Sequence, residues 1–323
     1  MEEIPPDETP LATEAGDRLA ARLAAGFFGG RRARLRRIVG KGSVNQVFVA
    51  EGGDGERIVV RMCDGPYALE QHEKEAWCIA QARGVGVPGP EVFAVGVADG
   101  AAYMIESFVE GAVGDELPAA AAPRVWRKLG QYARAIHTIE TDGFGVNLPD
   151  FTSGDARGGW LRYVDYNVES LDERDELLRL GVLAWEQSAL VRAIFEELRS
   201  REFRFGVNHG DLSLKNTIVD DAGRVHLLDW GTAFADIVPH HDLVQLLKKQ
   251  LTEGEPDDAG LAAFLEGYGM AREEYEALLP ELESVLLLRS FDLVRYAIDR
   301  CPDHIPFYAA RARLALARKF AHS

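Results

Sequence analysis

Residues 207–231 are the part of this chain that decides its fold, and they read Val-Asn-His-Gly-Asp-Leu-Ser-Leu-Lys-Asn-Thr-Ile-Val-Asp-Asp-Ala-Gly-Arg-Val-His-Leu-Leu-Asp-Trp-Gly. Two apolar runs flank an Asp-Ala-Gly turn, a pattern typical of a β-hairpin. A polar loop precedes the first predicted strand, and an Asp followed two residues later by Gly comes after the second. Because a hairpin brings its two ends together, we expect Asp211, Asn216 and Asp229 to converge.

Two carboxylates and one amide oxygen make a site of hard oxygen ligands. Such a site suits Mg²⁺, which takes a few protein oxygens and completes its octahedron with phosphate and water. The alternative is that these polar residues only form turns and helix caps. A single short motif often arises without any function, but here the spacing, the predicted strands around it and a second Asp all favour a functional site.

The spacing His-x-Asp-x-x-x-x-Asn, followed by a strand and Asp-x-Gly, resembles the catalytic signature of the protein-kinase-like fold. The sequence His-Gly-Asp-Leu at 209–212, together with Asp-Trp-Gly at 229–231, is similar to the corresponding motifs of the aminoglycoside phosphotransferase family. The resemblance extends over roughly residues 36–251. It implies an α+β fold of two lobes, a small antiparallel β N-lobe and a mainly helical C-lobe.

The resemblance also implies a role for each polar residue of the signature. Asp211 is the expected catalytic carboxylate, and His209 is expected to support the loop backbone rather than to transfer a proton. Asn216 and Asp229 are the expected ligands of Mg²⁺. Asp242, at the start of a predicted helix, is expected to be a cap or a brace for the catalytic loop.

The lobes are expected to meet where the composition changes. Short apolar strands dominate before residue 110, whereas long helices are predicted at 124–139, 185–201 and from about 257 to 320. We therefore expect a nucleotide-binding lobe at 1–110, in which 1–14 form a loose tail, and a helical lobe at 111–323 that carries the catalytic loop and the acceptor site.

A glycine-rich stretch lies near the start of the N-lobe. Gly40-x-Gly42-x-x-Asn45-x-Val47 resembles the kinase pattern Gly-x-Gly-x-x-Gly-x-Val, with Asn in place of the third glycine. Asn tolerates positive φ better than most residues, so the turn can still close. We expect the backbone of Gly40, Gly42, Ser43 and Asn45 to cover the nucleotide phosphates; the alternative is an ordinary hairpin.

The strand that follows carries Arg61 where protein kinases place a lysine, and the resemblance implies that it binds phosphate oxygens. Its partner should be a carboxylate on the predicted helix 69–82, where Glu70, Glu73 and Glu75 all qualify. By register Glu75 is the preferred one. The buried stripe of this helix is expected to contain Leu69, Ala76, Ile79 and Ala80.

Residues 103–111 resemble the hinge between kinase lobes, so backbone groups from Glu106 to Phe108 are expected to read the purine edge. Apolar side chains would sandwich the purine ring. The expected residues are Val47, Val60, Met104, Ile218 and Leu228.

The acceptor is expected to bind to the helical half, where acids are plentiful. The candidate substrate residues are Asp165, Glu169, Asp292 and Asp299, although most acids of this kind are ordinary solvated surface. The net charge of −16 favours a cationic small molecule and disfavours nucleic acid. The basic segment 311–319 cannot supply an acidic wall, which departs from well-known members of the family.

The remaining features exclude several classes. No apolar run is long enough to span a bilayer, and the acidic, proline-rich N-terminus does not have the form of a secretory signal. Three scattered cysteines show neither a disulfide framework nor metal-ligand spacing, which is typical of a reducing cytoplasm. We expect a cytoplasmic monomer or homodimer.

The expected function is phosphorylation of a hydroxyl on a small molecule, most simply an antibiotic, with ATP or GTP and Mg²⁺. The main alternative is a metabolic kinase for a choline-, homoserine- or sugar-like acceptor. A phosphate-binding pseudoenzyme is disfavoured because Asp211, Asn216 and Asp229 are all present. A protein kinase is disfavoured because no Ala-Pro-Glu segment follows Asp229.

Overall fold

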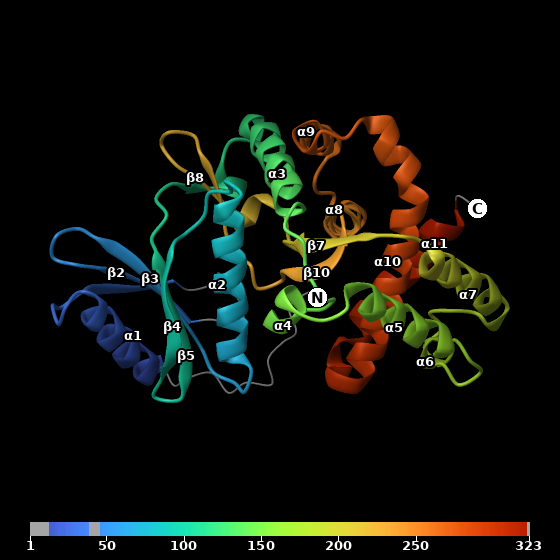
Figure 1. Ribbon diagram of the computed structural model, residues 1–323, viewed down its shortest axis with the longest axis horizontal. Coiled ribbons are helices and arrows are strands. Elements are labelled where there is room, and N and C mark those ends of the chain that lie inside the picture. Colours follow the sequence, from blue (N-terminus) through green and yellow to red (C-terminus); the bar gives the residue numbers. More distant parts are fainter. Residues whose placement is uncertain (1–12, 39–45, 322–323) are drawn as a thin grey trace. The chain divides into compact units, whose positions relative to one another are not determined.

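The computed structural model describes residues 13–38 and 46–321 (Figure 1). These residues form two compact units. The first, the sheet unit, holds the described residues up to Pro118 together with Leu214–Ala233. The second, the helical unit, holds Ala119–Ser213 and residues 234–321. An N-terminal antiparallel sheet and a mainly helical remainder confirm the expected α+β class.

The sheet unit is built on five antiparallel strands in the order β1-β2-β3-β5-β4. Their bounds are Arg34–Ile38 for β1, Gln46–Glu51 for β2, Arg57–Cys63 for β3, Val92–Ala98 for β4 and Ala101–Ser107 for β5. Successive side chains of a strand point to opposite faces, so each strand contributes to two environments. The two faces of this sheet differ in chemistry.

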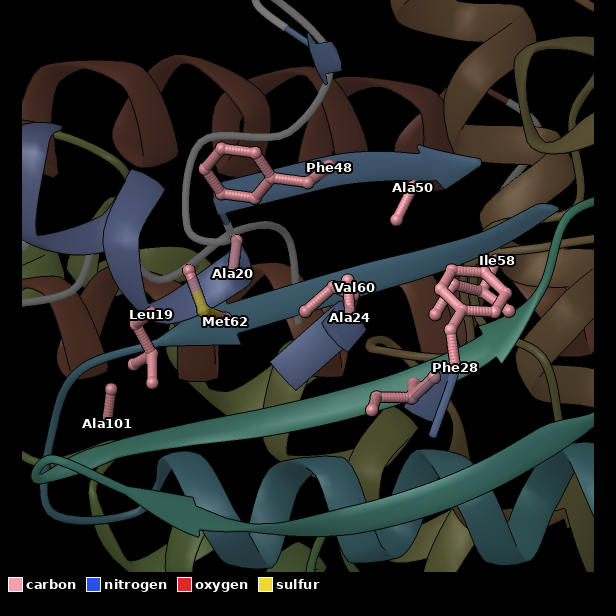
Figure 2. Packing of buried hydrophobic residues seen from close by; sticks show 11 residues of the cluster. Leu19, Ala20, Ala24, Phe28, Phe48, Ala50, Ile58, Val60, Met62 and Ala101 are labelled. Atoms are coloured by element: carbon pink, nitrogen blue, oxygen red, sulfur yellow. The ribbon is translucent and has the colours of Figure 1, made fainter. Parts of the chain in front are cut away.

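Helix α1 (Thr13–Phe27) packs on the apolar face. Figure 2 shows Leu19, Ala20 and Ala24 of the helix against Val60 and other buried side chains of the sheet. Such burial contributes about 25 cal/mol per Å² of apolar surface. The expected loose tail lies largely outside the described residues, but its last two positions, 13 and 14, already belong to α1.

Helix α2 (Ala68–Gly84) belongs to the other face of the sheet, and its buried residues are mostly not the expected apolar ones. Ile79 is buried as expected, whereas Ala80 is exposed. The helix instead buries three polar side chains, His72, Lys74 and Glu75. The apolar stripe therefore did not predict which side chains of α2 are buried, because the buried side of this helix contacts polar groups of the sheet and of a loop.

A second, three-stranded sheet completes the sheet unit, in the order β6-β8-β9. Its strands are Ala112–Val113, Thr217–Val219 and Val225–Leu227. Gly111, with φ of 145°, permits the close approach of β6 to β8, because a Cβ there would collide with the carbonyl oxygen of Val219. Because β6 pairs with β8, the compact units do not follow a single division of the chain at residue 110.

The helical unit contains two paired strands, β7 (Arg204–Asn208) and β10 (Phe234–Val238). Its helices are α3 (Ala122–Ile136), α4 (Leu148–Thr152), α5 (Ala156–Glu169), α6 (Glu176–Arg179), α7 (Trp185–Ser200), α8 (His240–Glu253), α9 (Asp258–Tyr268), α10 (Arg272–Arg300) and α11 (Ile305–Phe320). The long helices expected from the sequence are therefore present. None of the helices in the described part of the chain is both long and apolar enough to cross a membrane.

Candidate functional site

A row of paired residues crosses the face of the main sheet that lies opposite α1. Val47 of β2 pairs with Arg61 of β3, and Arg61 pairs with Met104 of β5. Directly paired residues share a face of a sheet. Arg61 therefore lies beside two of the apolar residues expected to contact a purine.

Val60 does not belong to this row, and its expected place beside a purine is wrong. It is fully buried in the core under α1, together with Ile58 and Met62. The reason is the alternation of a strand, since Val60 and Arg61 are neighbours and must point to opposite faces.

Arg61 is held by Glu75 of α2, at 2.6 Å between the guanidinium and the carboxylate. Glu75 is fully buried, and Arg61 is nearly so. Burial by itself lowers the pKa of Arg61, but nearby carboxylates, first among them Glu75, outweigh it and raise the pKa above its usual value. Of the three candidate glutamates, the structure thus pairs Glu75 with the guanidinium, whereas Glu70 and Glu73 are exposed.

The segment expected to read a purine lies at the end of β5. Burial raises the pKa of Glu106 to about 7, opposed in part by Arg61. The N–H groups of Ser107 and Phe108 already donate to carbonyl oxygens of Glu91 at 2.8 Å and Arg57 at 3.4 Å. The Arg57 guanidinium also covers the Phe108 ring, 4.4 Å from its centroid. A purine at this edge would compete with the longer of these two hydrogen bonds.

The two expected metal ligands are joined through the small sheet. The N–H of Leu228 donates to the carbonyl oxygen of Asn216 at 2.9 Å. Asp229 follows Leu228 in the chain, so this hydrogen bond holds the backbone on either side of the two expected ligands together. Asp229 has φ of 59°, which is uncommon for a residue other than glycine and marks a constrained turn. Ile218 and Leu228, both expected to contact a purine, are half-buried.

These residues fit Mg²⁺ in their chemistry, because a carboxylate and an amide oxygen are hard ligands. Within the described ranges there is no cluster of three or more His, Cys, Asp or Glu side chains that could hold a metal ion on its own. A cation at Asn216 and Asp229 would take these two protein oxygens, and phosphate oxygens and water would complete its coordination.

Lys74 is a residue that the sequence analysis missed. Its ammonium group donates to the carbonyl oxygen of Gly231 at 2.6 Å, two residues after Asp229. The side chain is 3% exposed, and burial lowers its pKa. A lysine next to Glu75 on the same helix was the available signal, but only the fold shows that it points at this loop.

In the helical unit, Asp242 of α8 holds the loop that contains Asp211. Its carboxylate accepts hydrogen bonds from the N–H groups of His209 at 3.1 Å and Gly210 at 2.7 Å. His137 lies 3.0 Å away from the same carboxylate through Nε2. The expected brace is confirmed, and His137 at the end of α3 supports the same carboxylate.

The side chains of the loop itself are also engaged. The N–H of Asp211 donates to Nδ1 of the fully buried His209 at 3.3 Å, which is the supporting role expected of the histidine. The carboxylate of Asp211 forms an ion pair with Lys249 of α8. Lys249 is buried, and nothing in the sequence marked it. The expected convergence of Asp211 with Asn216 and Asp229 stays a prediction, because Asp211 belongs to the other compact unit.

The four candidate acceptor acids have different surroundings. Asp165 is half-buried and pairs with Arg199 at 2.5 Å, while Glu169 and Asp299 are exposed. Asp292 alone is set among polar groups of the interior. Burial raises its pKa, opposed by Arg289. Asp292 and Asp299 lie seven residues apart on α10, yet only Asp292 has this environment.

Arg289 is a second residue that the sequence analysis missed. Its guanidinium lies within 4.8–5.7 Å of three ring centroids, those of Phe144, Tyr163 and Phe234. It also pairs with the fully buried Asp236. A guanidinium that is stacked and paired in this way joins α5, β10 and α10 into one framework beside Asp292.

The glycine-rich part of the expected nucleotide site belongs to residues 39–45. Gly40, Gly42, Ser43 and Asn45 lie outside the described residues. Their role over the phosphates stays a prediction. Val47, which closes the same motif, begins the row that contains Arg61.

Comparison with known proteins gives a family and a set of similar folds. A model of the phosphotransferase enzyme family matches residues 35–280. Comparison with curated proteins gives no match. Among solved structures, a thermostable mutant of aminoglycoside phosphotransferase APH(4)-Ia is 19% identical with a TM-score of 0.63, covering 94% of this chain and 100% of that one.

Two further structures have comparable scores. Macrolide 2'-phosphotransferase MphH from Brachybacterium faecium is 20% identical with a TM-score of 0.60, covering 91% of this chain and 97% of its own. A protein assigned as a fructosamine-3-kinase from Haemophilus somnus 129PT is 11% identical with a TM-score of 0.60, covering 93% and 96%. At these identities the likeness is one of fold, and it confirms the expected protein-kinase-like fold.

Proposed function

The chain belongs to the phosphotransferase enzyme family, and from this premise we propose that it transfers the γ-phosphoryl group of ATP or GTP to a hydroxyl of a small molecule. The expected resemblance to the aminoglycoside phosphotransferases is confirmed at the level of the family and the fold. The acceptor that we propose is an antibiotic, and phosphorylation would inactivate it.

One observation carries the proposal: Arg61 lies on the face of the sheet opposite α1 and is held there by the buried Glu75 of α2. A guanidinium fixed in this way is prepared to bind phosphate oxygens with two parallel hydrogen bonds. Its charge also interacts with Asp229 in the same unit. Arg61 therefore binds the nucleotide phosphates, while the half-buried Val47 beside it offers an apolar side chain to the base. Met104, the other neighbour of Arg61, is fully buried and can only support that surface.

Asn216 and Asp229 are the proposed ligands of Mg²⁺. When bound, the ion neutralises charge on the transferred phosphoryl group and on the leaving diphosphate. The chain's own contribution is to hold the two oxygen ligands in place. Two hydrogen bonds hold the backbone around these ligands, one from Leu228 to Asn216 and one from the Lys74 ammonium group to Gly231.

Asp211 is the proposed catalytic carboxylate. Phosphoryl transfer through a loose transition state needs the acceptor hydroxyl to be placed in line, and its proton leaves late. A carboxylate that accepts the hydroxyl hydrogen bond orients the nucleophile and then takes the proton. The backbone around Asp211 is held by the buried Asp242, which limits the freedom of the loop.

The acceptor class rests on the relatives and on charge. One APH(4)-Ia structure is a ternary complex with ADP and hygromycin B, and MphH is a macrolide 2'-phosphotransferase. The net charge of −16 favours a cationic acceptor. Asp292 is the strongest of the candidate acceptor acids, because it is the one set beside a rigid aromatic and cationic framework.

A metabolic kinase is the second candidate function. The structural likeness to a protein assigned as a fructosamine-3-kinase favours an acceptor that combines a sugar with an amine. Such an acceptor is also compatible with an acidic protein. The two candidates differ in the acceptor and share the nucleotide half.

The test is a nucleotide-turnover assay of the pure protein with a panel of acceptors, comprising aminoglycosides, macrolides, fructosamines, choline, homoserine and sugars. Asp211→Asn should lower kcat by about 10²–10⁴ at nearly unchanged nucleotide affinity. Asp229→Ala, or excess chelator on the wild type, should abolish turnover. Transfer to a fructosamine but to no antibiotic would favour the second candidate, and normal turnover by Asp211→Asn would contradict both.

A further inference from the structure

The pair formed by Asp211 and Lys249 is unusual because the proposed catalytic carboxylate already has a cationic partner. The ammonium group of Lys249 donates to Oδ1 of Asp211. The Lys249 side chain is 10% exposed and the Asp211 side chain 18%. A charged lysine is almost never so buried unless it is paired, so Asp211 accounts for the position of this charge.

Helix α8 brings two functional side chains to one loop. Asp242 and Lys249 are seven residues apart, hence on the same face of the helix and about 10 Å apart along its axis. Asp242 accepts the N–H groups of His209 and Gly210, and Lys249 pairs with the side chain of the next residue, Asp211. A single helix therefore holds the backbone of two consecutive loop residues, His209 and Gly210, and the side chain of the third, Asp211.

This arrangement has a chemical consequence for Asp211. A half-buried carboxylate accepts the proton of an acceptor hydroxyl only if it is ionised and correctly turned. An ammonium group on Oδ1 favours the ionised form and limits the rotation of the carboxylate. The energy of a pair with limited access to water is larger than that of a surface pair.

We propose that Lys249 is a positioning residue for Asp211, which holds the carboxylate ionised and oriented toward the acceptor hydroxyl. This inference rests on the proposed function of Asp211. Its effect is on the transfer step, because Lys249 acts through Asp211 and not on the nucleotide.

The experiment compares Lys249→Ala and Lys249→Arg with the wild type in the acceptor assay. Lys249→Ala should lower kcat by about 10²-fold, as a displaced reacting group does, with the KM values for nucleotide and acceptor within about threefold of the wild type. Lys249→Arg keeps the charge and should recover part of the loss. Lys128→Ala, at a half-buried lysine of α3 that bonds to Gln131, is the matched control and should turn over normally.

Chemical rescue separates charge from packing. Ethylammonium ions should restore part of the activity of Lys249→Ala, because they supply a cation in the space left by the side chain. Ethanol and sodium chloride at the same concentrations should not. An unchanged kcat in Lys249→Ala, or equal effects of ethylammonium and ethanol, would overturn the proposal.

A measurement without turnover distinguishes failure of this inference from failure of the proposed function. A double-mutant cycle of Asp211→Asn and Lys249→Met in urea unfolding should show a larger coupling than the exposed Arg127–Glu266 pair of the same unit. If the wild type phosphorylates no acceptor, the proposed function fails while the pair is still tested. If the coupling is no larger than that of the control pair, the inference fails even in an active enzyme.

Discussion

The ammonium group of Lys74 and the carbonyl oxygen of Gly231 lie 2.6 Å apart, although 157 residues separate them in the chain. This hydrogen bond ties helix α2 to the loop that carries Asp229. The helix that fixes Arg61 through Glu75 thus also fixes the proposed metal ligand. One helix therefore governs both the proposed phosphate cation and the proposed Mg²⁺ site.

Lys74→Met should weaken binding of the magnesium nucleotide by roughly 10–100-fold, the usual effect of removing a group that orients a metal ligand. Binding of the nucleotide in excess chelator should change much less. Calorimetric titration with and without Mg²⁺ measures the difference. Glu73→Gln, at an exposed position next to Lys74 on the same helix, is the control. The same loss with and without the ion would contradict a role in holding Asp229.

Arg61→Ala should weaken nucleotide binding by roughly 10–100-fold, because a hydrogen bond to a charged group is worth about 1.5–3 kcal/mol. Arg61→Lys should keep part of the affinity, since a cation remains but the planar fork does not. Glu75→Gln should resemble Arg61→Lys. Fluorescence titration with a nucleotide analogue measures all three. Wild-type affinity in Arg61→Ala would move the phosphate cation elsewhere.

Asp242 should make the stability of the protein fall at low pH. Burial by itself raises its pKa, but the His137 hydrogen bond and neighbouring histidines outweigh burial and lower the pKa from 3.8 to about 2. Because the folded-state pKa is depressed, the stabilisation is present above about pH 4 and is lost as the pH falls toward 2. The integrated effect is on the order of 2–3 kcal/mol.

Urea unfolding between pH 2 and 6 tests this, with Asp242→Asn against the wild type. The variant should be less stable at pH 6, and its stability should fall less steeply below pH 4. Asp165→Asn, which removes a half-buried carboxylate paired with Arg199, should leave the slope of the wild type nearly unchanged. An identical pH slope in Asp242→Asn would show that another carboxylate controls the acid limb.

The apparent KM for the acceptor should rise with ionic strength if the acceptor is cationic, because salt screens attraction between exposed charges beyond about 10 Å at 0.1 M. The comparison is between 20 and 300 mM potassium chloride with kcat recorded alongside. The kcat at saturating nucleotide and acceptor serves as the internal control for general salt effects. A flat acceptor KM would favour a neutral sugar or a macrolide held by apolar contacts.

How far the sequence predicts this molecule depends on whether the relevant residues share a local pattern. Asp211, Asn216 and Asp229 belong to one motif, so their types and spacing predict them together. The burial of Val60 could have been predicted from the alternation of side chains along a strand, because its position next to Arg61 places it on the opposite face of the sheet.

Contacts between residues that are far apart in the chain could not be predicted from the sequence. Lys249 lies 38 residues beyond Asp211 and has no motif of its own. Arg289 was likewise unmarked, because its surrounding rings come from α5, β10 and the segment before α4. The polar face of α2 was hidden for the same reason, since burial of Lys74 is caused by a loop that only the fold supplies.

The pairing of β6 with β8 joins Ala112 to Val219, more than a hundred residues further along the chain. During synthesis, the N-terminal sheet can form early, because its strands follow one another closely. The small sheet can form only after the ribosome has released the later hairpin, because two of its three strands belong to that hairpin. Contacts between residues so far apart in the chain also form slowly. Asn216 and Asp229 therefore join the sheet unit late, and an incomplete chain that ends before residue 214 carries Arg61 without the proposed metal ligands.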